Sequence, residues 1–384
     1  MNLMKTLADE RKDKFSPNPD ESYTLAAPYF YDPALYEREK ERLFARNWRF
    51  VGHQSELATA GDYLTLDLAG ERILVMRGQD GNIRAFHNVC RHRAAELVKG
   101  RGNVKAVVTC PYHSWAYDLE GNLRSAHNCE NVKGFRKEDF SLKSVQVEIF
   151  CGFVFVNLDP KAVSLKSQIA EMEPLIRREC PNVEAFKLAS RQDYLVKANW
   201  KAIVDNYIES YHLALSGPAH KAFTDLVECD KSTFKVTTHN IWSSHIGPSG
   251  PNRNTAYDYE EPRDIGGSNQ FMSIHLFPDI GLLFFPGASA VVSFIMSPTG
   301  PETTQQIFSY YTPDGAADEA TKKGIHYFSY VLGPEDNELC EGVQRGLRSR
   351  AYYQGRLMVD AEHSGISEHA VHHFHAQVMK AMGD

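Results

Sequence analysis

Two short segments carry cysteine and histidine at metal-ligand spacing: Cys90-Arg91-His92 and Cys110-Pro111-Tyr112-His113. Seventeen residues separate His92 from Cys110, so each pair can occupy the tip of its own loop. Two thiolates on one iron and two imidazoles on the other can hold a 2Fe-2S cluster. A structural zinc ion takes the same residue types, but its paired ligands usually have two to four residues between them. The one-residue C-x-H spacing favours the iron–sulfur cluster over zinc.

Short β segments flank both pairs. An extended run, residues 83–89, follows the turn signal at residues 80–82 and leads into the first pair. Residues 107–109 and 115–117 enclose the second pair, so two hairpins can present four ligands to one cluster. The stretch 90–115, with its CRHR and CPYHSW motifs, resembles the Rieske domain of the ring-hydroxylating oxygenases. The resemblance implies that a second iron motif lies further along the chain.

A second group of potential metal ligands lies in residues 199–220, which read NWKAIVDNYIESYH, then LALS, then GPAH. If residues 199–215 are helical, Asp205, Glu209 and His212 fall at i, i+4 and i+7 and share one face. Two histidines and one carboxylate make the facial triad of non-heme Fe(II) oxygenases, which leaves positions for O2 and substrate. The NWK, DNYIESYH and GPAH segments resemble the mononuclear-iron motif of Rieske oxygenase α subunits.

The resemblance implies that His212 and His220 are two of the iron ligands. The family usually has four residues between its two histidines, whereas the fifth position after His212 is Gly217 here. We interpret residues 213–216 as an expansion before GPAH, with Gly217-Pro218 ending the helix so that the chain can bend back. The alternative is that His220 is an ordinary loop histidine.

The third ligand must come from later in the chain. Asp336 is the best match to the family's aspartate ligand, within the acidic run 335–338. Glu335 and Glu338 remain competitors for this role. An acidic run at the start of a helix is also explained by the helix dipole alone.

Residues 199–220 also supply candidate catalytic residues. Glu209 matches the family's bridging acid, which accepts hydrogen bonds from an iron-ligand histidine and from a Rieske histidine, here His113 of the neighbouring subunit. Such a carboxylate orients both imidazoles. The alternative is a plain surface acid. We also expect Asn206 and Asp205 to be catalytic.

Two other kinds of metal site are conceivable from the sequence, one in a histidine-rich segment near residue 370 and one with two carboxylate-bridged irons. His369 and His373, in a histidine-rich segment with His372 and His375, are spaced for one helix face, but we favour a structural or surface role. A carboxylate-bridged di-iron site needs two Glu-x-x-His motifs, and the sequence has one, at Glu209 and His212. Mononuclear iron is therefore the better interpretation.

Composition bounds the function classes. The 384 residues suffice for about two domains, and 42% hydrophobic content supports real cores. A net charge of −7 argues against nucleic-acid binding, and no apolar run approaches a membrane span. We expect a cytoplasmic protein whose other cysteines are free thiols, most of them small core residues: Cys129, Cys151, Cys180, Cys229 and Cys340.

The pattern of elements predicts an α+β protein. Residues 49–160 read as short strands and turns and predict a small all-β Rieske domain. Residues 161–384 mix strand runs with helical segments and predict a catalytic domain in which helices pack on an antiparallel sheet. Residues 1–48 are expected to be an N-terminal helical segment on the catalytic domain, with residues 33–48 a solvated surface helix.

The two motifs together imply the terminal oxygenase component of a Rieske non-heme iron oxygenase, an oxidoreductase with a 2Fe-2S cluster and a mononuclear Fe(II). No Rossmann or flavin motif is found, so an NAD(P)H-dependent reductase, with or without a ferredoxin, must supply electrons. The family also implies a head-to-tail homotrimer. The alternative is a Rieske electron carrier, which would need little beyond the first 160 residues.

The substrate is the least determined property. The GPAH form and the length look closest to the branch that acts on choline, carnitine and other betaines, while aromatic acids stay open. Several aromatic residues could cage a quaternary ammonium by cation–π attraction, or could simply be core residues: Tyr207, Trp242, Phe284, Phe285 and Phe294.

Overall fold

The computed structural model describes residues 13–227, 233–249, 256–259, 270–288 and 290–384. The chain forms two compact units. One is Lys40–Gln168, and the other joins Ile169–Asp384 to the N-terminal segment that ends at Glu39. The segment expected over residues 1–48 is therefore divided between the two units.

The unit Lys40–Gln168 is all β, as predicted. Its larger sheet is antiparallel, in the order β1 (Arg49–His53), β10 (Phe153–Asn157), β9 (Ser144–Phe150), β4 (Ile83–His87), β3 (Glu71–Arg77), β2 (Asp62–Leu68) and β5 (Arg101–Asn103). A smaller sheet contains β6 (Val107–Thr109), β7 (Ala116–Asp118) and β8 (Leu123–Ser125). One apolar core joins the two sheets through Leu74, Phe86 and Tyr117, and the side chains of Cys90 and Cys110 are part of it.

The second unit is built on an antiparallel sheet that also confirms the prediction. Its strands run in the order β11 (Lys187–Val196), β17 (Thr303–Thr312), β16 (Val291–Gly300), β15 (Ile280–Phe284), β14 (Gln270–Leu276), β13 (Trp242–Pro248) and β12 (Lys235–Thr238). Because directly opposed residues of paired strands point to the same face, the register places Ser273, Leu283 and Val292 in one row.

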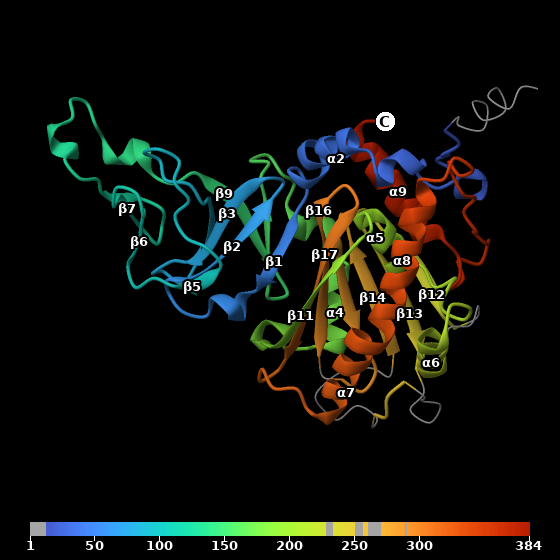
Figure 1. Cartoon of the computed structure of the whole chain (residues 1–384). Coiled ribbons are helices and arrows are strands. Elements are labelled where there is room, and N and C mark those ends of the chain that lie inside the picture. Colours follow the sequence, from blue (N-terminus) through green and yellow to red (C-terminus); the bar gives the residue numbers. More distant parts are fainter. Residues whose placement is uncertain (1–12, 228–232, 250–255, 260–269, 289) are drawn as a thin grey trace, which may run out of the picture. The chain divides into compact units, whose positions relative to one another are not determined.

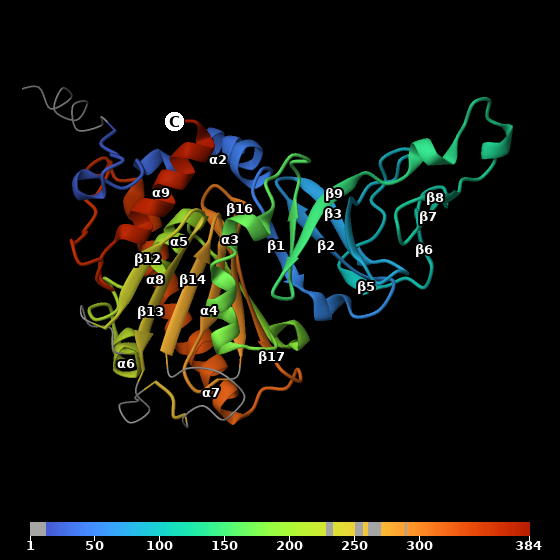
Figure 2. The same cartoon turned by 180° about the vertical axis from the view of Figure 1, so that it is seen from behind.

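Helices cover both faces of this sheet. On one face lie α5 (Trp200–Tyr207) and α8 (Gly333–Leu347) (Figure 1). On the other lies α4 (Met172–Glu179) (Figure 2). The other α-helices of the described residues are α2 (Pro33–Glu39), α3 (Leu165–Ile169), α6 (Pro218–Leu226), α7 (Glu319–Tyr327) and α9 (His369–Met382).

Shorter helical segments complete the described chain. Two are π-helical, η3 (Lys40–Phe44) and η9 (Phe328–Leu332). The others are 3-10 segments: η1 (Pro19–Glu21), η2 (Ala27–Phe30), η4 (Gln54–Leu57), η5 (Cys129–Asn131), η6 (Lys137–Phe140) and η7 (Val183–Ala185). No helix within the described ranges has the length and apolarity to cross a bilayer.

The helix expected over residues 199–215 is shorter, and that prediction was wrong. Asn199 caps its start, because the Asn199 side chain accepts a hydrogen bond from the Lys201 amide at 2.9 Å. The helix ends at Tyr207. Beyond it, the Glu209 carboxylate accepts hydrogen bonds from the backbone amides of Tyr211 and His212, which competes with continued helical bonding. Glu209 and His212 therefore lie beyond the end of the helix, His212 in a turn, and they share no helix face.

The prediction of a solvated helix over residues 33–48 was also wrong. Glu39, at the end of α2, is fully buried and forms an ion pair with the buried Lys201. Its second carboxylate oxygen accepts a hydrogen bond from Trp200 Nε1 at 2.9 Å. Leu43 and Phe44 in the following π-helical turn are buried as well. The alternating charges of this segment indicated a solvent-exposed helix, but Glu39, Leu43 and Phe44 point into the protein interior.

Candidate metal centres

The two cysteine–histidine segments form loops with the same backbone hydrogen bonds. The Cys90 amide donates to Ala95 O at 2.8 Å, and the Ala94 amide donates back to Cys90 O at 3.0 Å. The Cys110 loop repeats this pattern with Trp115 O and the Ser114 amide. Ala94 and Ser114 both have positive φ, 55° and 57°. Twin loops of this kind present two pairs of ligands with matching geometry.

The structure brings the four side chains of these loops together. Cys90 and Cys110 are buried and lie within hydrogen-bonding reach of each other. The rings of His92 and His113 meet edge to face with 4.7 Å between their centroids. His92 also stacks on Trp115, with 4.8 Å between centroids. The thiols therefore face the apolar core, while the imidazoles lie at the loop tips.

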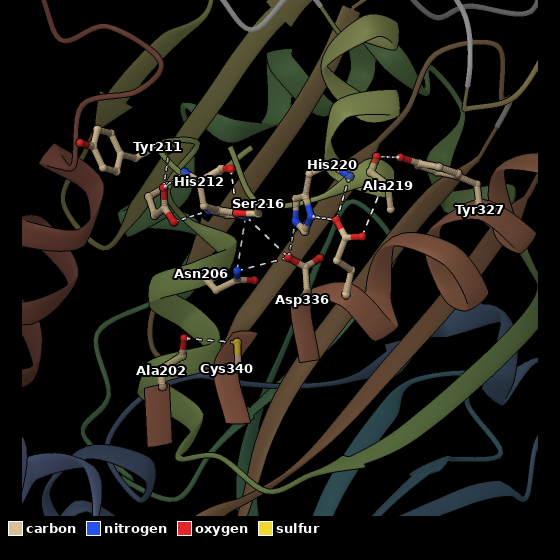
Figure 3. A network of polar contacts seen from close by, with 12 residues as sticks. Ala202, Asn206, Tyr211, His212, Ser216, Ala219, His220, Tyr327, Asp336 and Cys340 are labelled. Atoms are coloured by element: carbon tan, nitrogen blue, oxygen red, sulfur yellow. Dashed lines mark hydrogen bonds and ion pairs between the residues drawn. The ribbon is translucent and has the colours of Figure 1, made fainter. Parts of the chain in front are cut away.

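The second cluster joins three elements of the other unit. His220 Nε2 lies 2.9 Å from Asp336 Oδ1, and His212 Nε2 lies 3.6 Å from the same oxygen. One ligand atom from each of the three residues lies within 4.8 Å of the others. Figure 3 shows this convergence, with the Asn206 amide between His212 and Asp336. Asn206 Nδ2 donates to Asp336 Oδ1 at 3.2 Å.

A carboxylate stands behind each imidazole of this cluster. Glu209 contacts His212 Nδ1, and Glu335 contacts His220 Nδ1. An ionised carboxylate can only accept a hydrogen bond, so each Nδ1 carries the proton. Both Nε2 atoms therefore point toward Asp336. Glu335, a competing candidate for the third ligand, lies on the opposite side of the His220 ring from Asp336, and Glu338 is exposed.

The cluster is electrically complementary to a cation. Burial lowers the pKa of His212, but hydrogen bonds to Asp336 and Glu209 outweigh it and raise the pKa to about 10. Burial raises the pKa of Asp336, and its two histidine partners reverse this and hold the pKa well below its usual range. The site thus attracts positive charge, and a divalent ion bound at the two Nε2 atoms would displace the protons there while each Nδ1 keeps its own.

A cavity of about 110 Å³ opens beside this cluster, between α5, α8 and one face of the sheet. Asn206, Glu209, His212 and Asp336 are among its polar lining residues. The aromatic part of the lining, called the aromatic wall below, consists of Tyr207, Phe223, Phe271, Phe294, Phe308 and Phe328. Two of the five aromatic candidates from the sequence, Tyr207 and Phe294, are therefore cavity residues. Trp242, Phe284 and Phe285 are buried but are not in its lining.

A second cavity, of about 360 Å³, shares Asn206, Glu209 and His212 with the first. Asp205 and Glu368 also line it. Burial, with help from the charges of Glu209 and Asp205, raises the pKa of Glu368 to about 7. Glu209 therefore lines both cavities, the one beside the metal cluster and the one that contains Asp205 and Glu368.

Asp205 does not join the His212 cluster in the way that a shared helix face would require. It accepts a hydrogen bond from His375 Nε2 at 2.9 Å, since His375 Nδ1 itself accepts from the Leu25 amide. The other histidines of α9 have separate partners. His369 bonds to Ser367, His372 to Ser16 O and His373 to Gln377. The contacts of these rings fit the structural role favoured from the sequence.

Cysteines outside the metal loops behave as expected where the structure describes them. Among the described residues no two cysteines form a disulfide. Cys151, Cys180 and Cys340 are buried and Cys129 is half-buried. Cys229 lies outside the described residues.

Both donor sets fit the cofactors that the motifs imply. Two imidazoles and one carboxylate on converging elements are the ligands of a mononuclear non-heme iron. Two thiolates and two imidazoles on twin hairpin loops suit a Rieske 2Fe-2S cluster. The backbone amides of Tyr112 and His113, which donate to Cys110, add hydrogen bonds that stabilise a thiolate.

Comparison with known proteins defines the class. Residues 183–384 match the family model of the ring-hydroxylating α subunit catalytic domain, and residues 47–136 match that of the Rieske [2Fe-2S] domain. The chain belongs to the Rieske oxygenases that carry both domains. It therefore contains a Rieske cluster and a mononuclear iron.

Several known proteins are similar to this chain along most of its length. The oxygenase subunit of carnitine monooxygenase from Escherichia coli K12 is 41% identical over 372 residues, which cover 96% of this chain and 97% of the relative. Choline monooxygenase from Amaranthus tricolor is 29% identical, covering 93% and 77%. A solved quaternary ammonium Rieske monooxygenase is 38% identical with a TM-score of 0.86, covering 96% and 98%. Naphthalene 1,2-dioxygenase from Rhodococcus shares the fold, with a TM-score of 0.79 at 20% identity over 99% and 97%.

These findings establish the general activity. The chain is the terminal oxygenase component of a Rieske non-heme iron system, an oxidoreductase that takes electrons from a reductase and uses O2 on an organic substrate. The alternative of a bare electron carrier is wrong, because a complete catalytic domain follows the Rieske domain.

Proposed function

We propose that this oxygenase acts on a small quaternary ammonium compound of the carnitine and choline type. The observation that carries the proposal is the cavity beside the metal cluster, which combines an aromatic wall with carboxylates. The face of an aromatic ring attracts a cation, and the attraction grows when water is excluded. The described residues that line the cavity include no lysine or arginine to pair with an aromatic acid.

The size of the cavity supports the same substrate class. Its volume of about 110 Å³ lies below the ~300–1,000 Å³ of drug-sized ligand pockets, so a compact group such as trimethylammonium suits it. Phe294 and Phe308 stack with 4.2 Å between centroids and form a rigid patch of the aromatic wall. Tyr207 packs edge-on against Phe294, and its hydroxyl lies 3.1 Å from the backbone carbonyls of Ile274 and Leu282, to one of which it donates. This wall can therefore keep its shape when a substrate enters.

The residue roles follow from the geometry. His212, His220 and Asp336 are proposed to hold the iron, which supplies a site where O2 is activated next to the substrate. Glu209 orients His212 through its Nδ1 proton. Asn206 holds its amide against His212 Nε2 and Asp336 Oδ1, next to the proposed metal position. Asp205, bonded to His375, is proposed to act by holding α9 against α5.

Electrons are proposed to arrive through the cluster held by Cys90, His92, Cys110 and His113. An NAD(P)H-dependent reductase, with or without a ferredoxin, would reduce this cluster. We further propose a head-to-tail homotrimer in which His113 of one subunit meets Glu209 of the next. Exposed apolar side chains support such docking: Tyr211 and Leu215 near Glu209 are 46% and 78% exposed, and Tyr112 beside His113 is 59% exposed.

The substrate is tested by O2 uptake and product analysis with a surrogate reductase. Carnitine, choline and glycine betaine are compared with benzoate and phthalate. The matched control for charge is 3,3-dimethylbutanol, which has the shape of choline without its positive charge. We expect at least one ammonium compound to give product with coupled O2 uptake, and the neutral analogue to bind at least about tenfold more weakly.

Turnover of an aromatic acid in preference to every ammonium compound would overturn the proposed substrate class. Equal binding of choline and its neutral analogue would show that the aromatic wall recognises shape rather than charge. Neither result would affect the membership of the chain in the Rieske oxygenases, which rests on both domains.

A further inference from the structure

The connection between the two histidines of the iron cluster is longer than the family spacing and needs its own support. Seven residues separate His212 from His220, where the family usually has four. Residues 208–217 connect the end of α5 to α6, which begins at Pro218. His220, the third residue of α6, is nevertheless fully buried with Nε2 2.9 Å from Asp336. Something must hold the start of α6 in place.

Glu335 makes the contacts that could do this. One carboxylate oxygen accepts a hydrogen bond from the His220 amide at 3.1 Å, and the other accepts from the Ala219 amide at 3.3 Å. The first oxygen also contacts His220 Nδ1. A carboxylate at a helix N-terminus satisfies amides that have no partner inside the helix and is favoured by the helix dipole. Glu335 therefore binds both the backbone and the ring of His220.

Gly217 provides an independent observation. A Cβ atom at this position would lie 2.6 Å from the carboxyl carbon of Glu335, too close for any real contact. The backbone itself does not require glycine here, because φ is 176° and any residue adopts this extended conformation. A side chain at position 217 would therefore displace the Glu335 carboxylate from its place against α6.

We propose that Glu335 is a positioning residue for the mononuclear iron site. It fixes the Nδ1-protonated form and the orientation of the His220 ring, and it holds the start of α6 so that the longer connection still delivers Nε2 to the metal. The proposal rests on the assignment of His220 as an iron ligand. Glu335 thus orients His220 through its Nδ1 proton, as Glu209 orients His212.

The position of Glu335 in the chain makes this coupling direct. Asp336 follows it on the first turn of α8, so neighbouring residues grip opposite nitrogens of one imidazole, Asp336 at Nε2 and Glu335 at Nδ1. Movement of the α8 terminus would displace both groups together. The Ala219 carbonyl, which accepts from Tyr327 Oη at 2.6 Å, adds a further anchor for α6 (Figure 3).

The test measures iron binding rather than turnover. Fe²⁺ is titrated anaerobically into protein depleted of mononuclear iron but with its Rieske cluster intact, and the EPR signal of the nitric oxide adduct reports the ligand geometry. Glu335→Ala is expected to weaken Fe²⁺ binding by about 10–100-fold and to broaden that signal, with the Rieske spectrum unchanged. Glu335→Gln retains an acceptor and should recover part of the affinity. The matched control is Glu338→Ala, an exposed acid of the same helix, which should bind iron normally.

A double-mutant cycle with Gly217 tests the mechanism. Gly217→Ala should weaken iron binding in the native background by displacing the carboxylate, and it should cause little further loss when Glu335 is already alanine. Unchanged affinity in Glu335→Ala, or full additivity of the two substitutions, would overturn the proposal. His220→Ala distinguishes failure of the positioning role of Glu335 from failure of the ligand assignment. If His220→Ala also leaves iron binding unchanged, His220 is not an iron ligand.

Discussion

The two metal regions of this chain are built in opposite ways. The Rieske ligands come as two short pairs on twin loops, and each pair is held mainly by hydrogen bonds within its own loop. The mononuclear site instead joins a turn after α5, the start of α6 and the start of α8, and Glu335 follows His220 by 115 positions in the sequence. The first site is a local structure inserted in a sheet, and the second exists only when the whole domain has folded.

This difference predicts how each site responds to damage. A local loop can keep its ligands together when distant parts of the chain change. A site assembled from three elements depends on the residues that hold those elements, such as Glu209 and Glu335. Substitutions in the catalytic domain should therefore affect the mononuclear iron and leave the Rieske cluster in place.

The largest effect is expected for His220→Ala. Losing one of three ligands should remove the mononuclear iron, so that about three irons per chain fall to about two, and turnover should be lost. The protein should remain brown and keep the low-field EPR signal of a cluster with two cysteine and two histidine ligands. Metal analysis and EPR of the purified variant check this.

The matched control for His220→Ala is the exposed His326 of α7, whose replacement by alanine should change neither iron nor activity. Retention of mononuclear iron and activity in His220→Ala would show that the expanded connection delivers a different ligand. A colourless native protein with stoichiometric zinc would refute the Rieske ligand assignment as well.

A smaller but still large effect is expected for Glu209→Gln. Glutamine keeps the size of the side chain, so both metal sites should load, but it removes the charge that orients His212 and that we propose to meet His113 of the next subunit. Turnover should fall by about 100-fold or more, because electrons pass more slowly between the centres. Stopped-flow oxidation of the reduced Rieske cluster in the presence of O2 and substrate measures that step.

Glu338→Gln is the control, since it removes an exposed acid without touching either site. Full activity of Glu209→Gln would show that this electron route does not exist. An enzyme that works at full rate as a monomer would contradict the proposed trimer. Slow cluster oxidation with normal iron content would support the bridging role.

The same contrast explains what the sequence could reveal. The Rieske ligands are adjacent residues with a specific spacing, so Cys90, His92, Cys110 and His113 were predicted together. The cluster of His212, His220 and Asp336 was predicted from resemblance, because nothing local links residues so far apart. The helix over residues 199–215 was wrong since Glu209 captures backbone amides, a side-chain contact that periodicity does not report. Glu335 was noticed only as a competitor of Asp336.

The residues of the aromatic wall could not be predicted as a group from the sequence. Its members come from α5, α6, the sheet and the π-helical turn before α8, and they share no sequence spacing. Phe223, Phe271, Phe308 and Phe328 were not singled out, while Trp242 and Phe285 were. Strand register, which places Phe294 opposite Phe308, decides which rings face the cavity. An isolated phenylalanine in a strand carries no signal of that register.

The Rieske loops also have a hydrogen-bond partner outside the two ligand pairs. Tyr117, in β7, is fully buried, and its Oη lies 3.4 Å from Cys90 Sγ. The Arg91 amide donates to the same oxygen at 2.9 Å. The hydroxyl proton of Tyr117 is therefore free to point at the sulfur. A hydrogen bond to a ligand sulfur stabilises the reduced, more negative cluster.

The smallest effect is thus expected for Tyr117→Phe. One hydrogen bond worth about 1 kcal/mol corresponds to roughly 40 mV in a one-electron couple, so the reduction potential of the cluster should fall by about that amount. Iron content and the mononuclear site should not change, because Tyr117 touches a loop that holds its own ligands. Redox titration followed by EPR measures the shift, with Tyr112→Phe as the exposed control. An unchanged potential would mean that the loops alone set it; loss of the cluster would mean that they need the sheet to hold their ligands.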